Sequence, residues 1–177
     1  MSRALILLVV GLALTSLGCG YALAGRGNTL PAYIRTIGVP SLANQSTTPS
    51  IDQVFTDAVR SEFQTRGRYV VRPDASGADA VLTGAVTGVR VQAAALNQIS
   101  QATSKTIIVT ASVEFKDLHD NKVLWANSSF LLTEQYSDSS SSTPNDPAAI
   151  FRQDAPALDR LSKRFAKEIV AAVFEAF

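Results

Sequence analysis

The chain contains one cysteine, Cys19, and one histidine, His119. A cysteine thiolate next to a histidine base is the arrangement of a nucleophilic enzyme, but these two residues lie about 100 positions apart. His119 falls in the segment Leu-His-Asp-Asn-Lys, whose residue types are typical of a hairpin turn. One cysteine excludes an internal disulfide, and one cysteine with one histidine cannot form a Cys/His metal cluster. We therefore expect no catalytic site, no metal and no cofactor, and we interpret His119 as a turn residue.

Cys19 follows an uncharged, mostly apolar segment, residues 4–17, which begins directly after Arg3. A transmembrane helix needs about 20 apolar residues, so this segment is short for spanning a bilayer. A positive start, a short apolar stretch and small residues at its end are typical of an export signal. The alternative is a buried N-terminal helix, for which no capping residue lies nearby.

The segment Leu-Gly-Cys-Gly at residues 17–20 resembles the lipobox of bacterial lipoproteins, although Ser16 stands where the lipobox usually has leucine. The resemblance implies cleavage after Gly18 and acylation of Cys19, and Gly20 in place of aspartate implies the outer membrane. Two or more acyl chains are sufficient for stable anchoring. A structural or nucleophilic role for Cys19 remains the alternative. We expect a signal peptide at 1–18, a lipidated linker at 19–32 and one domain at 33–177.

Length and composition favour a single globular domain. The chain has 177 residues, of which 46% are hydrophobic and 18% charged. The net charge of +1 gives no indication of nucleic-acid binding. Loss of residues 1–18 removes Arg3 and leaves 15 basic and 15 acidic side chains.

Two segments show the apolar spacing of amphipathic helices. The first begins after Ser50, which we expect to act as the N-cap, and stops at Gly67. The second begins near Pro156 and continues to the C-terminus. Their predicted buried stripes are Ile51, Val54, Phe55, Ala58, Val59 and Phe63 in the first, and Leu158, Leu161, Phe165, Ile169, Ala172 and Val173 in the second.

Strands are predicted at 33–40, 68–74, 81–96, 106–117 and 123–136. Residues 106–117 alternate between apolar and polar, as expected for a strand with one wet face. In the returning strand the alternation places Phe130 and Leu132 on one face and Trp125 on the other. We predict an α+β fold, a two-layer sandwich with two amphipathic helices on one face of a mostly antiparallel sheet of about four strands. The other face carries Thr, Ser, Glu and Lys.

The ordered set of segments resembles the LptE family of lipopolysaccharide-assembly lipoproteins. The matching segments are "CGYALAGRGNTLPAYIRTIGVPSLANQST", "IDQVFTDAVRSEF" ending in "RG", "ADAVLTGAV", "LHDNKVLWANSSF" and the final helix. The resemblance implies a non-enzymatic plug inside the outer-membrane β-barrel LptD, which supports assembly of the barrel and helps to deliver lipopolysaccharide to the outer leaflet.

Contact with the phosphates of lipid A would require Lys or Arg near the strand tips. Arg90 and Lys105 flank the first tip, and we expect them to make any such contact. A second resemblance, carried by "IRTIGVPSLANQSTTP", is to lipoproteins with a TolB-N-terminal-like domain, which include activators of peptidoglycan synthases and the curli secretion lipoprotein. That resemblance implies a regulator of a cell-envelope enzyme or a subunit of a secretion pore.

Overall fold

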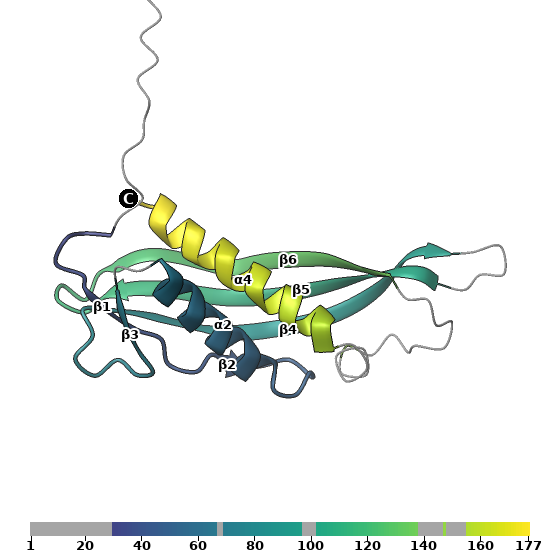
Figure 1. The fold of residues 1–177 in the computed structure, drawn as a ribbon, viewed down its shortest axis with the longest axis horizontal. Coiled ribbons are helices and arrows are strands. Elements are labelled where there is room, and N and C mark those ends of the chain that lie inside the picture. The colour runs from purple at the N-terminus through teal and green to yellow at the C-terminus, as the bar shows by residue number, and fades with distance from the viewer. Residues whose placement is uncertain (1–29, 67–68, 97–101, 138–146, 148–154) are drawn as a thin grey trace, which may run out of the picture.

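A computed structural model describes residues 30–66, 69–96, 102–137, 147 and 155–177. It forms two layers, in which two helices lie across one face of a single sheet (Figure 1). In chain order the elements are β1 (Thr36–Gly38), β2 (Ala43–Asn44), α2 (Ile51–Thr65), β3 (Val70–Arg72), β4 (Ala80–Leu96), β5 (Ala102–Asp117), β6 (Val123–Ser137) and α4 (Ala155–Glu175). The α+β sandwich with two helices on one face is therefore confirmed.

The sheet has six strands and is mixed, so the prediction of about four mostly antiparallel strands is corrected. Its order is β3-β1-β4-β5-β6, and β2 pairs with β4 off this path. The long strands β4, β5 and β6 are antiparallel, whereas β1 and β2 both pair parallel to β4, and β3 pairs parallel to β1. Helix α2 connects β1 to β3, and a helical crossover makes neighbouring strands parallel. Strands of two or three residues are too short to show an alternating pattern in the sequence.

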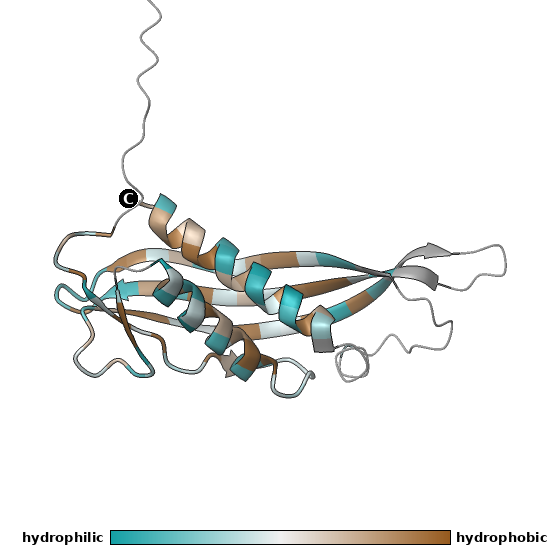
Figure 2. Ribbon diagram, viewed as in Figure 1, coloured by the Kyte–Doolittle hydropathy of each residue, from teal (hydrophilic) through white to brown (hydrophobic). Residues whose placement is uncertain are grey.

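The core lies between the sheet and the two helices, and aromatic side chains fill its centre. Phe55 of α2 packs on Phe165 of α4, and Phe63 stacks on Phe115 of β5. Figure 2 shows apolar residues alternating with polar ones along both helices and the strands beneath them. The apolar residues of β5 that were predicted to share a face are all buried: Ile107, Val109, Ala111, Val113 and Phe115.

Helix α2 begins where predicted, but Ser50 does not cap it. Ser50 has a left-handed backbone with φ of 60°, and its side chain makes no capping hydrogen bond. A capping residue normally has an extended backbone, which directs its oxygen to the first turn. The predicted stop at Gly67 lies outside the described residues. Within the described part, α4 begins at Ala155, next to the predicted start at Pro156.

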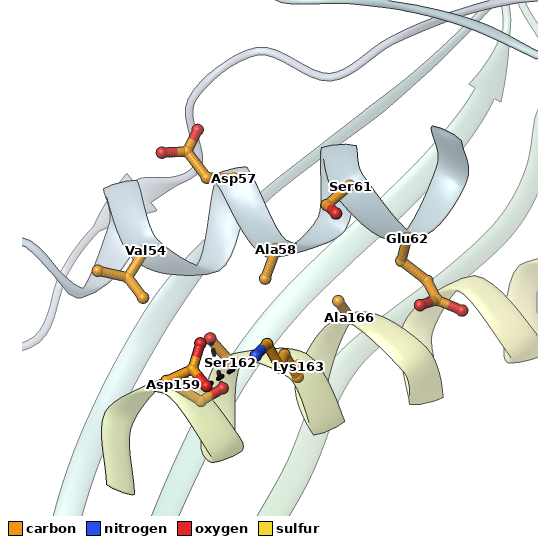
Figure 3. A pocket seen from close by; sticks show the side chains of 9 residues that line it. All are labelled: Val54, Asp57, Ala58, Ser61, Glu62, Asp159, Ser162, Lys163 and Ala166. Carbon is orange, nitrogen blue, oxygen red and sulfur yellow. Dashed lines mark hydrogen bonds and ion pairs between the residues drawn. The ribbon is translucent and has the colours of Figure 1, made fainter. Parts of the chain in front are cut away.

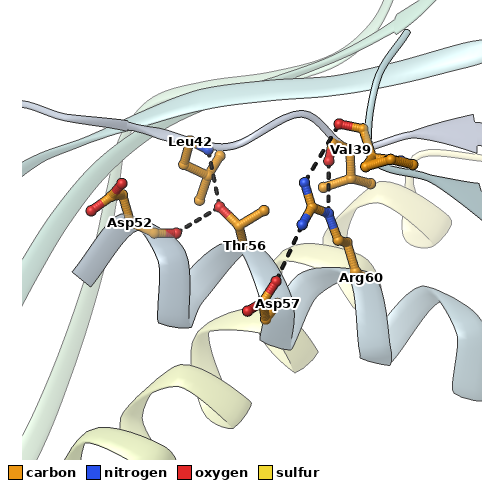
Figure 4. A network of polar contacts seen from close by, with 7 residues as sticks. Val39, Leu42, Asp52, Thr56, Asp57 and Arg60 are labelled. Carbon is orange, nitrogen blue, oxygen red and sulfur yellow. Dashed lines mark hydrogen bonds and ion pairs between the residues drawn. The ribbon is translucent and has the colours of Figure 1, made fainter. Parts of the chain in front are cut away.

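Side chains of α2 satisfy the backbone where the chain leaves the sheet edge between β1 and β2 (Figure 4). The backbone N–H of Leu42 donates to Thr56 Oγ1 over 3.0 Å, and the Thr56 hydroxyl donates to the carbonyl of Asp52 over 2.6 Å. Arg60 Nε donates to the carbonyl of Val39 over 2.9 Å. These bonds fix α2 against the edge segment that follows β1.

A β-bulge in β6 corrects the predicted orientation of Trp125. The register between β5 and β6 shifts after the Ala111–Phe130 pair, so that Val113 opposes Asn127. This shift inserts an extra residue in β6, and a one-residue shift moves the following side chains to the other face. Trp125 therefore lies opposite Phe115 and packs against the core.

Candidate interaction surface

The face of strands β4, β5 and β6 that points away from α2 and α4 carries mainly uncharged polar side chains. We call it the open face. The strand register aligns its residues in rows across the sheet. Three of these rows are Arg90, Ile108 and Thr133; Gly88, Thr110 and Leu131; and Thr83, Glu114 and Ala126. The open face agrees with the prediction of one sheet face rich in Thr, Ser, Glu and Lys.

The open face is hollowed beside the bulge in β6. The hollow has a volume of about 300 Å³ and is lined by Thr83, Gly84, Ser112, Val113, Glu114, Ala126, Asn127 and Ser128. Gly84 allows the strands to approach closely, because an added Cβ would lie 2.4 Å from the carbonyl oxygen of Ser112. The open face is thus uneven, and its polar hollow is lined by hydroxyl groups and one carboxylate.

A second hollow of about 340 Å³ lies on the helix side, between α2 and α4 (Figure 3). Small residues of both helices, Ala58, Ser61 and Ala166, line it, and their short side chains leave the space between the helices unfilled. The charged groups of α4 at its rim pair with each other, since Lys163 Nζ lies 2.8 Å from Asp159 Oδ2. Local pairing within one helix turn is typical of a solvated helix surface.

A polar cluster fastens the first described residues to one end of the sheet. The Tyr33 hydroxyl donates to Asp117 Oδ2 over 2.5 Å, and Asp117 Oδ1 accepts the backbone N–H of His119 over 2.7 Å. Asp79 Oδ2 accepts the backbone N–H groups of Arg35 and Thr36 over 2.9 and 2.8 Å. Local sequence patterns do not predict this cluster, because Tyr33 and Asp117 are 84 residues apart.

His119 closes the same cluster from the hairpin turn. Its Nε2 lies 3.2 Å from Asp79 Oδ1, and its ring meets that of Tyr33 edge-on with centroids 5.6 Å apart. His119 is therefore a turn residue, as predicted, that also contacts the start of the domain. The apolar alternation of β5 ends at a buried aspartate, Asp117, and this break was the signal that could have indicated a polar partner.

The electrostatics of the cluster favour a structural role. The hydrogen bond to Asp117, with a smaller effect of burial, raises the pKa of Tyr33 to about 12. The bond from Tyr33 lowers the pKa of Asp117, and the backbone N–H groups of Arg35 and Thr36 lower that of Asp79. A phenol that stays protonated and two carboxylates that stay ionised act as fixed donor and acceptors at neutral pH, which is unsuited to general acid–base catalysis.

The structure does not bring the predicted lipopolysaccharide-contact residues together. Arg90 is exposed on the open face, opposite Ile108. Lys105 belongs to the alternating set of β5 that faces the helices, and its side chain is only 3% exposed. The predicted cleavage and acylation residues, Gly18 and Cys19, lie outside the described residues.

The described part of the chain contains neither a candidate metal site nor a helix that could span a membrane. Among those residues, no group of three or more His, Cys, Asp or Glu side chains is placed to hold a metal ion. Neither of the two described helices combines the length and apolar character needed to cross a membrane.

Comparison with known proteins identifies a family and a shared fold. Residues 34–173 match the family model of LptE, described as lipopolysaccharide-assembly. No curated protein matches the chain in sequence. The PelC dodecamer from Paraburkholderia phytofirmans is 19% identical, with a TM-score of 0.51 over 82% of this chain and 93% of that chain. The hypothetical protein CT253 from Chlamydia trachomatis is 13% identical, with a TM-score of 0.52 over 79% and 95%. At these identities the two structures show that the fold is shared.

Proposed function

Because the chain belongs to the LptE family of lipopolysaccharide-assembly lipoproteins, we propose that it plugs the outer-membrane β-barrel LptD. In this role it supports assembly of the barrel and assists insertion of lipopolysaccharide into the outer leaflet. The family match covers more than half of the chain, including both helices almost entirely and all six strands. The family is non-enzymatic, which agrees with the fixed protonation of the Tyr33 cluster.

The observation that supports a plug is the open face. The lumen of an outer-membrane barrel is polar. A surface that fits it needs hydroxyl and amide groups with few unpaired charges, because each buried unpaired charge is costly. The open face offers such groups over three long strands and is not covered by α2 or α4.

The proposed anchor is an acylated Cys19, exposed as the first residue by cleavage after Gly18. The acyl chains would hold the protein on the periplasmic leaflet of the outer membrane, near the barrel. A tether of this kind raises the local concentration of the domain without adding a contact to the complex. The barrel should therefore bind through the open face and the loops.

Co-purification tests the plug directly. A version that starts at Gly20 should still form a one-to-one complex with an LptD barrel when the two are expressed together. Leu131→Arg places a charge on the open face and should reduce recovery of the barrel. Gln64→Arg places the same charge on the exposed surface of α2 and serves as the matched control.

Three results of this experiment would contradict parts of the proposal. A folded Gly20 version that recovers no barrel would exclude the plug. Recovery of a peptidoglycan synthase in place of a barrel would favour the TolB-N-terminal-like regulator. Equal losses with Leu131→Arg and Gln64→Arg would show that the open face is not the contact.

Direct contact with lipid A phosphates belongs to the same proposal. Arg90 is exposed on the open face, where it is accessible to a ligand in the barrel lumen. Lys105 follows the first strand tip on the other face and is almost fully buried. The proposal therefore gives Arg90 the larger share of any phosphate contact, and the two residues are separable by single substitutions.

A further inference from the structure

Exposed apolar side chains gather at one end of the sheet. Five large apolar side chains are exposed in the described part of the chain. Four of them lie at the end where β1 and β6 begin: Tyr33 (48% exposed), Val70 (63%), Val123 (46%) and Phe177 (38%). The fifth, Leu131 (58%), lies farther along β6 on the open face. Large apolar side chains that are exposed at the same end of a molecule make that end a candidate for an interaction surface.

Hydrogen bonds link three of these residues across the sheet end. The backbone N–H of Val70 donates to the carbonyl of Arg35 over 2.9 Å, two residues after Tyr33. The Tyr33 hydroxyl bonds to Asp117, whose backbone N–H donates to the carbonyl of Lys122 over 2.8 Å. Lys122 directly precedes Val123, so the three residues share one end of the sheet, with Val70 on the edge strand β3 and Val123 on the opposite edge strand β6.

The C-terminus joins the same end. Phe177 donates its backbone N–H to the carbonyl of Phe174 over 3.4 Å, and the Phe174 ring stacks on that of Tyr69 with centroids 5.6 Å apart. Tyr69 directly precedes Val70. Figure 1 shows the C-terminus at the end of the view where β1 and β3 lie. We call Tyr33, Val70, Val123 and Phe177 the tether end.

Exposed charged side chains of both signs surround the tether end, and the acidic ones include Asp120 and Glu175. Arg35, Arg72 and Lys122 are exposed, and none of them forms an ion pair with another described residue. The carboxylates of Asp79 and Asp117 are occupied by hydrogen bonds from the protein. At a membrane surface, arginine and lysine bury their aliphatic stems among the lipid headgroups while their charged ends remain in water. Aromatic residues favour the same headgroup layer.

The covalent tether reaches the domain at this end. Ten residues separate Cys19 from Leu30, the first described residue, which packs into the core within three residues of Tyr33. A fully extended chain spans at most about 3.6 Å per residue, so eleven steps reach about 40 Å. An acylated Cys19 would thus keep the start of the domain within about 40 Å of the lipid headgroups, whereas the strand tips are farther along the sheet.

We propose that the tether end docks on the bilayer surface, with Tyr33, Val70, Val123 and Phe177 in the headgroup layer and Arg35, Arg72 and Lys122 at its rim. This inference rests on the proposed acylation of Cys19. Docking fixes the long axis of the sheet relative to the membrane, so that the open face is presented in one orientation. A covalent tether alone would leave the domain free to rotate.

Depth measurements on the acylated full-length product test the docking. Acylation uses the only native cysteine, so a substituted cysteine is the sole free thiol of the mature protein. Val70→Cys, Val123→Cys and Leu131→Cys are each labelled with an environment-sensitive fluorophore. Each protein is then placed in vesicles of phosphatidylethanolamine and phosphatidylglycerol, with and without brominated lipid as quencher. Leu131→Cys is the matched control, because Leu131 is apolar and as exposed as Val70 but distant from the tether end.

Docking predicts a blue shift and a loss of emission with brominated lipid at positions 70 and 123, and neither effect at 131. Equal quenching at all three positions, or none at 70 and 123, would overturn the docking. Vesicle flotation and intact mass report the anchor separately. A protein that floats with the vesicles but whose labels are not quenched is anchored without docking, and this result excludes the docking. A chain that carries no acyl groups overturns both the proposed anchor and the docking. The vesicles contain no barrel, so quenching cannot come from LptD.

Discussion

The rings of Phe55 and Phe165 pack with their centroids 4.5 Å apart and an angle of 36° between their planes. Phe55 comes from α2 and Phe165 from α4, and both rings are completely buried. Phe130 of β6 meets Phe165 edge-on at 5.5 Å, so the pair connects both helices to the sheet. The helical spacing of apolar residues had predicted that each ring faces the core, and this is confirmed.

Removal of one ring should destabilise the domain strongly. Phe55→Ala is expected to lower the free energy of unfolding by about 3–5 kcal/mol, because it leaves a cavity and removes an aromatic contact. Chemical denaturation followed by circular dichroism measures the change. Leu131→Ala, at an exposed position, is the control and should change stability by at most about 0.5 kcal/mol. Equal midpoints for Phe55→Ala and the wild type would refute the proposed packing.

Thr56 should contribute stability through its hydroxyl group. Thr56→Val keeps the shape but leaves the N–H of Leu42 without its acceptor, and the expected loss is about 1–3 kcal/mol. The control is Thr65→Val on the same helix, where the hydroxyl donates to the carbonyl of Ser61 at an exposed site. The denaturation midpoint of Thr56→Val should be lower than that of Thr65→Val. Similar midpoints would show that the network in Figure 4 is energetically neutral.

Tyr33→Phe should change how stability depends on acid. The hydrogen bond from Tyr33 lowers the pKa of Asp117 from the ordinary 3.8, so the bond stabilises the fold above about pH 4 and less as pH falls below it. The variant should be less stable than the wild type at pH 7, and the difference should shrink at pH 3. Urea midpoints at both pH values measure this, and a difference that grows on acidification would contradict the assignment.

The alkaline limb of the same experiment has the opposite sign. The folded protein raises the pKa of Tyr33 to about 12 from 10. Stability from the bond is therefore fully present below pH 10 and is lost as pH rises toward 12. Ultraviolet titration of the phenolate should show one tyrosine of the wild type that ionises late, and Tyr33→Phe should remove it.

Acylation is expected at Cys19 after loss of residues 1–18. Intact-mass analysis of protein extracted from membranes should show a diacylated or triacylated chain that begins with this cysteine. Cys19→Ser should abolish the added mass and release the protein from the membrane fraction. An N-terminus elsewhere would exclude the lipoprotein cleavage after Gly18.

Arg90→Ala should weaken binding of lipopolysaccharide at low salt, because an exposed charge contact is screened as ionic strength rises. Lys105→Ala should have the smaller effect on binding, since its side chain is almost fully buried. Affinity measurements at two salt concentrations separate the effect of Arg90→Ala from that of Lys105→Ala. Arg160→Ala on α4 is the control. A larger loss with Lys105→Ala would reverse the assignment, and an unchanged double variant would exclude both residues.

Local patterns in the sequence determined the helices and the long strands. Apolar residues at helical spacing predicted α2 and α4 to within a few residues, because the periodicity of a helix is repeated over several turns. Strict alternation predicted the buried residues of β5, and Asn121 gave the hairpin turn its left-handed residue with φ of 54°. Whole-chain similarity indicated the family, which residues 34–173 confirm.

The tertiary structure alone decided how distant segments meet. The parallel pairing of β1, β2 and β3 depends on the crossover through α2, and strands of two or three residues carry no readable period. The bulge that turns Trp125 toward Phe115 shifts the register by one residue, which alternation cannot foresee. Arg90 and Lys105 are both near one strand tip in the sequence, yet they point to opposite faces because side-chain direction depends on register and on bulges. The Tyr33–Asp117 bond joins residues 84 positions apart, and only the folded chain brings them within 2.5 Å.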